Sequence, residues 1–255
     1  MWLIKTILAF WTPLIIATDH DSAHALGKQL YLRYGLPGIT RCKTNFAFGC
    51  HHGLAENALV KHPEYLLPLA KTCERLGAPG SGPHVSCIHG LGHGVAGVTS
   101  QKKLPQALSK CNKLVTWANY CHDGVFMEGG LSDWKFECGK LPSRYRAMCW
   151  RNMPAIWYRQ GLPWSEIIAR CPHPECIASI GRQIAQISQG NPDPIKQHCP
   201  DIKCITVAAG EVVFQNLPNW PTKVEAICAN NIACLEFSEQ VAKDYAISRT
   251  TDQKP

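Results

Sequence analysis

The sequence predicts an all-α protein, an α-solenoid of about seven disulfide-linked helical hairpins. Three observations lead to this prediction: the chain has 255 residues with 45% hydrophobic composition, its fourteen cysteines form seven successive couples, and helical patterns flank each couple. The second cysteines of the couples recur every 27 to 37 residues, a period typical of stacked helical repeats.

The couples are predicted to form local disulfides, because their two cysteines stand close in sequence and the number is even. None is a C-x-x-C pair, which disfavours a structural zinc site of the ribbon or finger type. In chain order the couples are Cys42 and Cys50, Cys73 and Cys87, Cys111 and Cys121, Cys138 and Cys149, Cys171 and Cys176, Cys199 and Cys204, and Cys228 and Cys234.

Each couple is predicted to join two helices. Proline opens a short helical pattern before the first cysteine, as in residues 62–73, 104–111, 162–171 and 221–228, and proline suits the first turn of a helix. A second helical pattern follows the second cysteine in every unit. These second helices are predicted at residues 50–59, 87–98, 121–131, 149–161, 176–188, 204–216 and 234–245.

The first 25 residues are typical of a secretory signal peptide or N-terminal anchor. Lys5 precedes an apolar stretch that extends to Ala17, and Ala23-His24-Ala25 has the small-x-small pattern of a cleavage site. Cleavage after Ala25 or retention as an anchor are both compatible with this pattern. We therefore predict a single helical-repeat domain at residues 26–255, located in a secreted or periplasmic setting or anchored through the N-terminal segment.

The second helices are predicted to bury one face. Positions one, four, five and eight after the second cysteine are mostly apolar and lie on one side of a helix. Examples are Ile88, Leu91 and Val95; Ile177, Ile180 and Ile184; and Ile205 and Val212.

Metal-binding side chains occupy the opposite face in the first three units. His89 and His93 stand four residues apart, a spacing at which two imidazoles on one helix can bind one ion. The equivalent positions hold His52 and Glu56 in the preceding unit, and Asp123 in the following unit. Gly53, Gly90 and Gly124 recur at position three, where they would let neighbouring helices approach closely.

This pattern predicts a transition metal site with His52, Glu56, His89, His93 and Asp123 as ligands. Nitrogen and oxygen donors of this kind suit iron, zinc, copper or manganese. Glu128 is predicted as a catalytic general base or as a partner of a ligand. The alternative is a hydrogen-bonded ladder of polar side chains without an ion. His51 and His122 are predicted to be core or supporting residues.

Three functions stay open: a metal-dependent enzyme, a metal carrier, and a non-catalytic solenoid that grips a peptide or protein partner in its concave face. Confinement of the donors to three of seven units favours a localised metal site. The net charge of +7 is spread along the chain, so nucleic-acid binding is not expected. No second apolar segment is long enough to span a membrane.

The architecture between Cys42 and Tyr245 resembles the disulfide-linked Sel1-type repeat proteins, although the alanine- and glycine-rich Sel1 consensus is absent. The stacking of His and Glu on successive repeats is similar to the arrangement in HEAT-repeat di-iron hydroxylases. Those proteins carry adjacent His-Glu dipeptides, which this chain lacks. Neither di-iron chemistry nor hydroxylation is therefore implied by the resemblance.

Overall fold

The computed structural model describes residues 14–17, 19–44 and 46–245. These residues form α-helices and short 3₁₀ helices, with no strand among them, which confirms the predicted all-α class. Within the same ranges, no helix has both the length and the apolar composition needed to cross a bilayer. The apolar stretch of the predicted signal segment lies largely outside the described residues.

The chain divides into two compact units after Gly129, where the sequence predicted one repeat domain. The stacking of all seven hairpins into one solenoid stays a prediction. The first unit contains α2 (His20–Tyr34), η1 (Leu36–Arg41), α3 (Gly49–Lys61), η2 (Pro63–Tyr65), α4 (Leu66–Cys73), α5 (Gly82–Gly97), η3 (Gln101–Lys103), α6 (Leu104–Cys111), η4 (Asn112–Trp117) and most of α7 (Ala118–Leu131).

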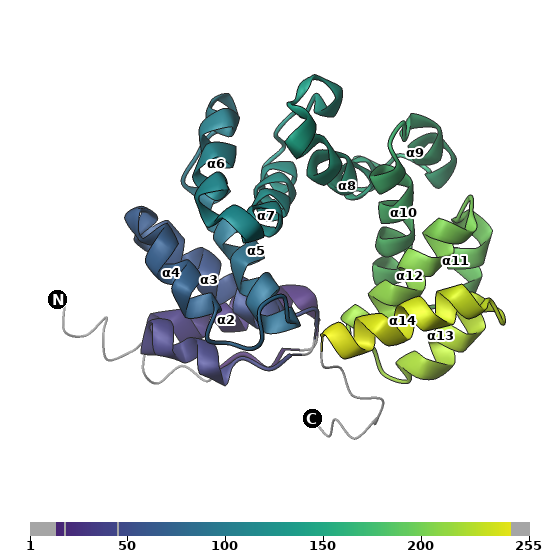
Figure 1. Cartoon of the computed structure of the whole chain (residues 1–255), viewed down its shortest axis with the longest axis horizontal. Helices are drawn as coiled ribbons and strands as arrows, with labels where there is room; N and C mark the ends of the chain where they lie inside the picture. Colours follow the sequence, from purple (N-terminus) through teal and green to yellow (C-terminus); the bar gives the residue numbers. More distant parts are fainter. Residues whose placement is uncertain (1–13, 18, 45, 246–255) are drawn as a thin grey trace. The chain divides into compact units, whose positions relative to one another are not determined.

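The second unit repeats the alternation of a short helix and a longer one. It contains η5 (Cys138–Lys140), α8 (Ser143–Arg159), α9 (Trp164–Arg170), α10 (Pro174–Ile187), α11 (Pro192–His198), α12 (Ile202–Phe214), α13 (Trp220–Cys228) and α14 (Ile232–Asp244). In Figure 1 the two series of helices can be followed by colour, purple to teal in the first unit and green to yellow in the second.

All seven predicted disulfides are present and confirm the local pairing. Each joins a shorter helix, or the residue directly after it, to the N-terminal half of the longer helix that follows. Their sequence separations range from 5 to 14 residues, so each closes a short loop worth about 2–3 kcal/mol on the chain-entropy model. No cysteine among the described residues is free.

The predicted apolar stripe forms the core between longer and shorter helices. In α5, Ile88, Leu91 and Val95 are buried, and α4 and α6 pack against this helix. The second unit has an equivalent core around Ile180 and Ile184. Ile177 and Ile205 are only partly buried at its margin.

The longer helices of each unit pack on one another in chain order. In the first unit α2 packs on α3 and α3 on α5, while in the second unit α8, α10, α12 and α14 follow in the same way. Glycine permits the close approaches in the first unit. A Cβ on Gly53 would collide with the His24 carbonyl oxygen, one on Gly90 would lie 2.6 Å from the His52 carbonyl oxygen, and one on Gly124 would collide with that of His89.

The structured chain begins before the predicted boundary at residue 25. Residues 20–25 form the first turns of α2, Asp19 caps this helix through the Ser22 backbone N–H, and Ala23 is buried. A chain that began at Leu26 would lack these turns. Whether the N-terminal segment is cleaved stays a prediction.

Candidate metal centre

Five histidines from three successive helices meet in the first unit. His20 and His24 come from α2, His52 from α3, and His89 and His93 from α5. Neighbouring ring centroids lie 4.8 to 5.6 Å apart along the series His20–His24, His24–His52, His52–His89, His89–His93 and His24–His93. We call these five residues the histidine cluster. Gly53 and Gly90 bring the helices that carry the cluster within reach of one another, and Gly124 does the same for α7 and α5.

The tightest part of the histidine cluster is a group of three. His20, His24 and His52 each offer one ligand atom, and these atoms lie within 4.8 Å of one another. The His24 Nε2 and His52 Nδ1 atoms are 3.2 Å apart. Two nitrogens bound to one zinc ion at about 2.0–2.1 Å stand about 3.3 Å apart in tetrahedral geometry, so this group fits a transition metal ion.

The His89 and His93 side chains face each other beside this group. Their Nε2 atoms lie 3.0 Å apart, and both residues are buried. The spacing of four residues predicted from the sequence therefore does bring the two imidazoles together on one face of α5. This close contact of two ring nitrogens is a second place at which imidazole donors converge.

Three carboxylates face the Nδ1 atoms of three histidines of the cluster, and we call these Nδ1 atoms the outer ring nitrogens. Glu56 Oε2 is 3.6 Å from His24 Nδ1, Asp123 Oδ2 is 3.4 Å from His89 Nδ1, and Glu128 Oε2 is 3.1 Å from His93 Nδ1. A carboxylate on the Nδ1–H of a ligand histidine fixes its tautomer and makes its Nε2 a better donor. In this geometry the predicted ligands Glu56 and Asp123 support imidazoles, and Glu128 does so as well.

His20 is oriented by the backbone. Its Nδ1–H donates to the Phe46 carbonyl oxygen over 2.7 Å, which leaves Nε2 as the acceptor of the neutral ring. Burial, followed by the neighbouring His24, lowers the pKa of His20 to about 4. Near neutral pH this imidazole is therefore uncharged and able to bind a metal ion.

Burial and neighbouring charges shift the pKa values of two further residues of the centre. The pKa of His52 lies well below its ordinary value, first because the ring is buried and then because His89 and His24 are close. Burial alone would raise the pKa of Glu56, but His24, His93 and Lys28 lower it overall. The centre thus combines a neutral imidazole with a charged carboxylate, which is the state that metal binding requires.

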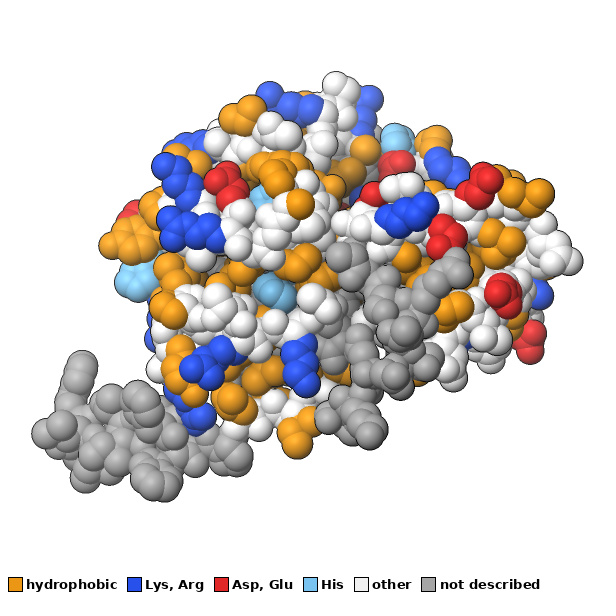
Figure 2. Space-filling model, turned by 60° about the horizontal axis from the view of Figure 1, so that its bottom comes forward, with side chains coloured by type: hydrophobic (Ala, Val, Ile, Leu, Met, Phe, Trp, Pro, Cys, Tyr) orange, Lys and Arg blue, Asp and Glu red, His pale blue; other side chains and the backbone are white. Residues whose placement is uncertain are grey.

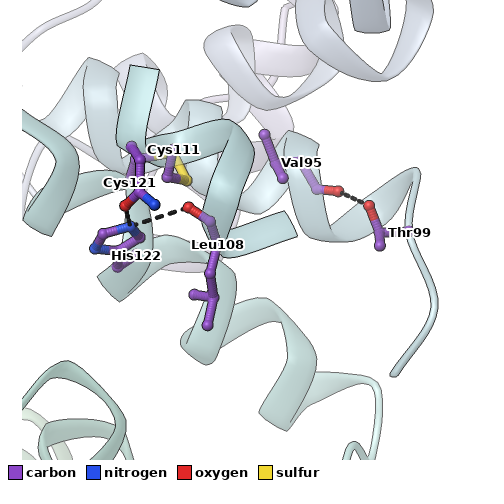
Figure 3. The surroundings of a disulfide bond; sticks show 7 residues. Val95, Thr99, Leu108, Cys111, Cys121 and His122 are labelled. Carbon is purple, nitrogen blue, oxygen red and sulfur yellow. Dashed lines mark hydrogen bonds between the residues drawn. A yellow bond between two sulfur atoms is a disulfide. The ribbon is translucent and has the colours of Figure 1, made fainter. Parts of the chain in front are cut away.

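His51 and His122 lie apart from the cluster, as predicted. His51 is buried beside Phe48, with ring centroids 6.1 Å apart, and burial lowers its pKa to about 4. Figure 3 shows His122 next to the Cys111–Cys121 disulfide, where its Nε2 lies 3.2 Å from the Leu108 carbonyl oxygen and 3.1 Å from Asn112 Oδ1. This imidazole therefore ties α7 to the end of α6.

The sequence analysis missed His20 and His24. It assigned both to the N-terminal targeting segment, although His20 and His24 have the same spacing of four residues as His89 and His93. That repeated spacing was the available signal. The structure adds these two residues to the six predicted site residues, all of which it brings to one region of the first unit.

The comparisons with known proteins add no family or relative. No protein-family model, curated protein or solved structure matches this chain. The geometry of the histidine cluster and the chemistry of its donors are therefore the basis for assigning a function.

Proposed function

We propose that this chain is an exported metalloprotein that binds a transition metal ion through His20, His24 and His52. The observation that carries the proposal is the convergence of three imidazole ligand atoms within 4.8 Å. Three histidines plus one open position is a ligand set found in catalytic zinc sites, where water or substrate takes the remaining position.

The disulfides support both the location and the choice of metal. Seven disulfides indicate an oxidising compartment, and secretion or periplasmic export is the setting we propose. Because no described cysteine is free, thiolate does not compete as a ligand. Imidazole nitrogen then favours Zn²⁺, Cu²⁺ or Fe²⁺ over Mn²⁺, which prefers oxygen.

The surface gives little support to nucleic-acid binding. Figure 2 shows Lys and Arg side chains scattered among apolar and acidic ones on the face in view.

Within the proposal, Glu128 is a positioning residue, because its carboxylate lies 3.1 Å from Nδ1 of His93. An ion held by imidazoles would act as a Lewis acid or would activate a bound water.

Metal analysis of protein exported to an oxidising compartment tests the proposal. The wild type should carry a stoichiometric transition metal, and a chelator should lower its melting temperature. A metal present at a thousand times its Kd contributes about 4 kcal/mol to the free energy of unfolding. His52→Asn should remove the ion bound at His20, His24 and His52, together with the part of the chelator sensitivity that this ion contributes.

His62→Asn is the matched control, because its half-exposed side chain lies outside the cluster and near Glu64. This variant should keep the metal and the wild-type response to chelator. Far-UV circular dichroism and mapping of the disulfides would verify that both variants fold. A wild type that neither contains nor takes up metal, and whose melting is indifferent to chelator, would leave the hydrogen-bonded ladder as the explanation of the cluster.

A further inference from the structure

We infer that the histidine cluster holds two metal ions, one at His20, His24 and His52 and a second between His89 and His93. This inference rests on the proposed function and extends it to a second binding position. We call the two places the triad position and the pair position.

Both imidazoles of the pair position have a carboxylate at Nδ1. His89 Nδ1 faces Asp123 and His93 Nδ1 faces Glu128, at 3.4 and 3.1 Å. A carboxylate accepts a hydrogen bond, so each carboxylate favours the tautomer with the proton on Nδ1 and the lone pair on Nε2. Those two Nε2 atoms lie 3.0 Å apart, with two lone pairs directed into the same space.

Two acceptors in contact repel each other unless a cation lies between them. Both residues are buried, His93 with an exposed fraction of 2%, so water screens the repulsion only weakly. Two nitrogens on a metal ion with bonds of about 2.0–2.1 Å are separated by about 2.9–3.3 Å for bond angles between 90° and the tetrahedral value, a range that includes the observed contact. The pair position therefore has the donor geometry of an ion site of its own.

A single ion does not account for both positions. Among the described residues, the three-residue group within 4.8 Å consists of His20, His24 and His52, and His89 and His93 do not join it. The triad position has its own short nitrogen contact, 3.2 Å between His24 Nε2 and His52 Nδ1. Each position thus has a separate pair of converging nitrogens.

The two positions are adjacent. The His52 ring lies 4.9 Å from that of His89, and the His24 ring lies 5.6 Å from that of His93, measured between centroids. Neighbouring ions of this kind can bind one bridging oxygen ligand between them. Glu56 supports the triad position, whereas Asp123 and Glu128 support the pair position.

Zinc stoichiometry tests the inference. Exported full-length protein would be stripped with chelator, titrated with Zn²⁺ alone, passed through a desalting column and analysed for zinc. The wild type should retain two equivalents. His20→Asn and His93→Asn should each retain one, because each removes a ligand from a different position, and His62→Asn should retain two.

The outcomes separate this inference from the proposed function. One equivalent in the wild type would overturn the second position and leave the proposed function standing. No retained zinc, together with no response to Cu²⁺, Fe²⁺ or Co²⁺ in the same assay, would overturn both. The wild-type stoichiometry needs no variant, so the test stands even if one substitution prevents folding.

Discussion

The α5–α7 pair of the first unit and the α10–α12 pair of the second use the same backbone arrangement with different side chains. Gly92 stands five residues after Cys87, and a Cβ on it would collide with the Cys121 carbonyl oxygen. Gly181 stands five residues after Cys176, and a Cβ there would collide with the carbonyl oxygen of Cys204. Each pair therefore contains the same close helix contact.

Side chains at equivalent positions form the cross-helix ion pairs. In the first unit His93, six residues after its cysteine, meets Glu128, seven residues after the next helix's cysteine, at 3.1 Å. In the second unit Arg182 and Glu211 occupy the same two positions, with 3.3 Å between Arg182 Nε and Glu211 Oε2.

Arg182 carries a permanent positive charge, so the Arg182–Glu211 pair contains its own cation. Glu211 also accepts hydrogen bonds from Gln186 and Gln215 at 2.8 and 2.7 Å, so its buried charge is fully partnered. His93, at the position equivalent to Arg182, carries no permanent charge, and its Nε2 atom lies 3.0 Å from His89 Nε2. One scaffold can therefore satisfy a carboxylate with a permanent cation of the chain, as at Glu211, or place imidazole nitrogens beside it, which on our proposal bind an added cation.

The largest effect is expected when the His93–Glu128 pair is changed to resemble the Arg182–Glu211 pair. His93→Arg places a permanent cation beside Glu128, so the pair position should lose its ion. The chelator-dependent stabilisation contributed by that ion, about 4 kcal/mol at a thousandfold excess over Kd, should disappear. Calorimetry with and without chelator measures this.

His93→Gln serves as the control, since it removes the imidazole without adding charge. It should also lose the ion and should be less stable than His93→Arg in chelator, because residue 93 then supplies no positive charge beside Glu128. Equal zinc content in His93→Arg and the wild type would contradict the equivalence of the two pairs.

A smaller effect is expected from glycines at the close helix contacts of the two units. Gly124→Ala and Gly181→Ala each force a Cβ against a backbone carbonyl oxygen, that of His89 or Cys204. Overpacking of this kind costs about 1–3 kcal/mol. Both variants should therefore unfold at lower urea concentration, but only Gly124→Ala should also weaken zinc binding.

Gly139→Ala is the neutral control, because nothing lies within 4 Å of its added Cβ. Zinc affinity measured by competition with a chromophoric chelator separates the two effects. Equal loss of zinc affinity in Gly124→Ala and Gly181→Ala would show that the helix contact does not position the centre locally.

The smallest effect concerns a buried histidine of the first unit outside the cluster. His84 Nδ1 accepts a hydrogen bond from the Gly80 N–H, and its ring lies edge-on to Trp117. Burial lowers the pKa of His84, although Glu74 opposes the shift. The unfolded chain therefore binds the proton more readily, and stability is lost as the pH falls below about 6.5.

Replacement with His84→Gln isolates this contribution. In chelator, the wild type should lose stability relative to His84→Gln between pH 8 and pH 5, by at most about 1.4 kcal/mol for each unit of pKa difference. Urea unfolding at the two pH values gives the difference. A gap between the two proteins that is independent of pH would mean that His84 does not titrate differently on unfolding.

The sequence could predict those features that depend on short distances along the chain. The pairing of Cys73 with Cys87 follows from loop closure over 14 residues, and the burial of Ile88 and Leu91 follows from helical periodicity. The same periodicity placed His89 and His93 on one face of a helix. These inferences need no knowledge of how distant helices pack.

Only the tertiary structure added His20 and His24 to the candidate centre. Their helix has no cysteine couple, and it reaches α3 through a close contact between Gly53 and His24, which are 29 residues apart in sequence. It also placed Glu56, Asp123 and Glu128 on outer ring nitrogens, whereas the sequence predicted Glu56 and Asp123 as ligands. Which side of an imidazole a carboxylate meets depends on the separation and rotation of packed helices, and helical periodicity alone does not fix either.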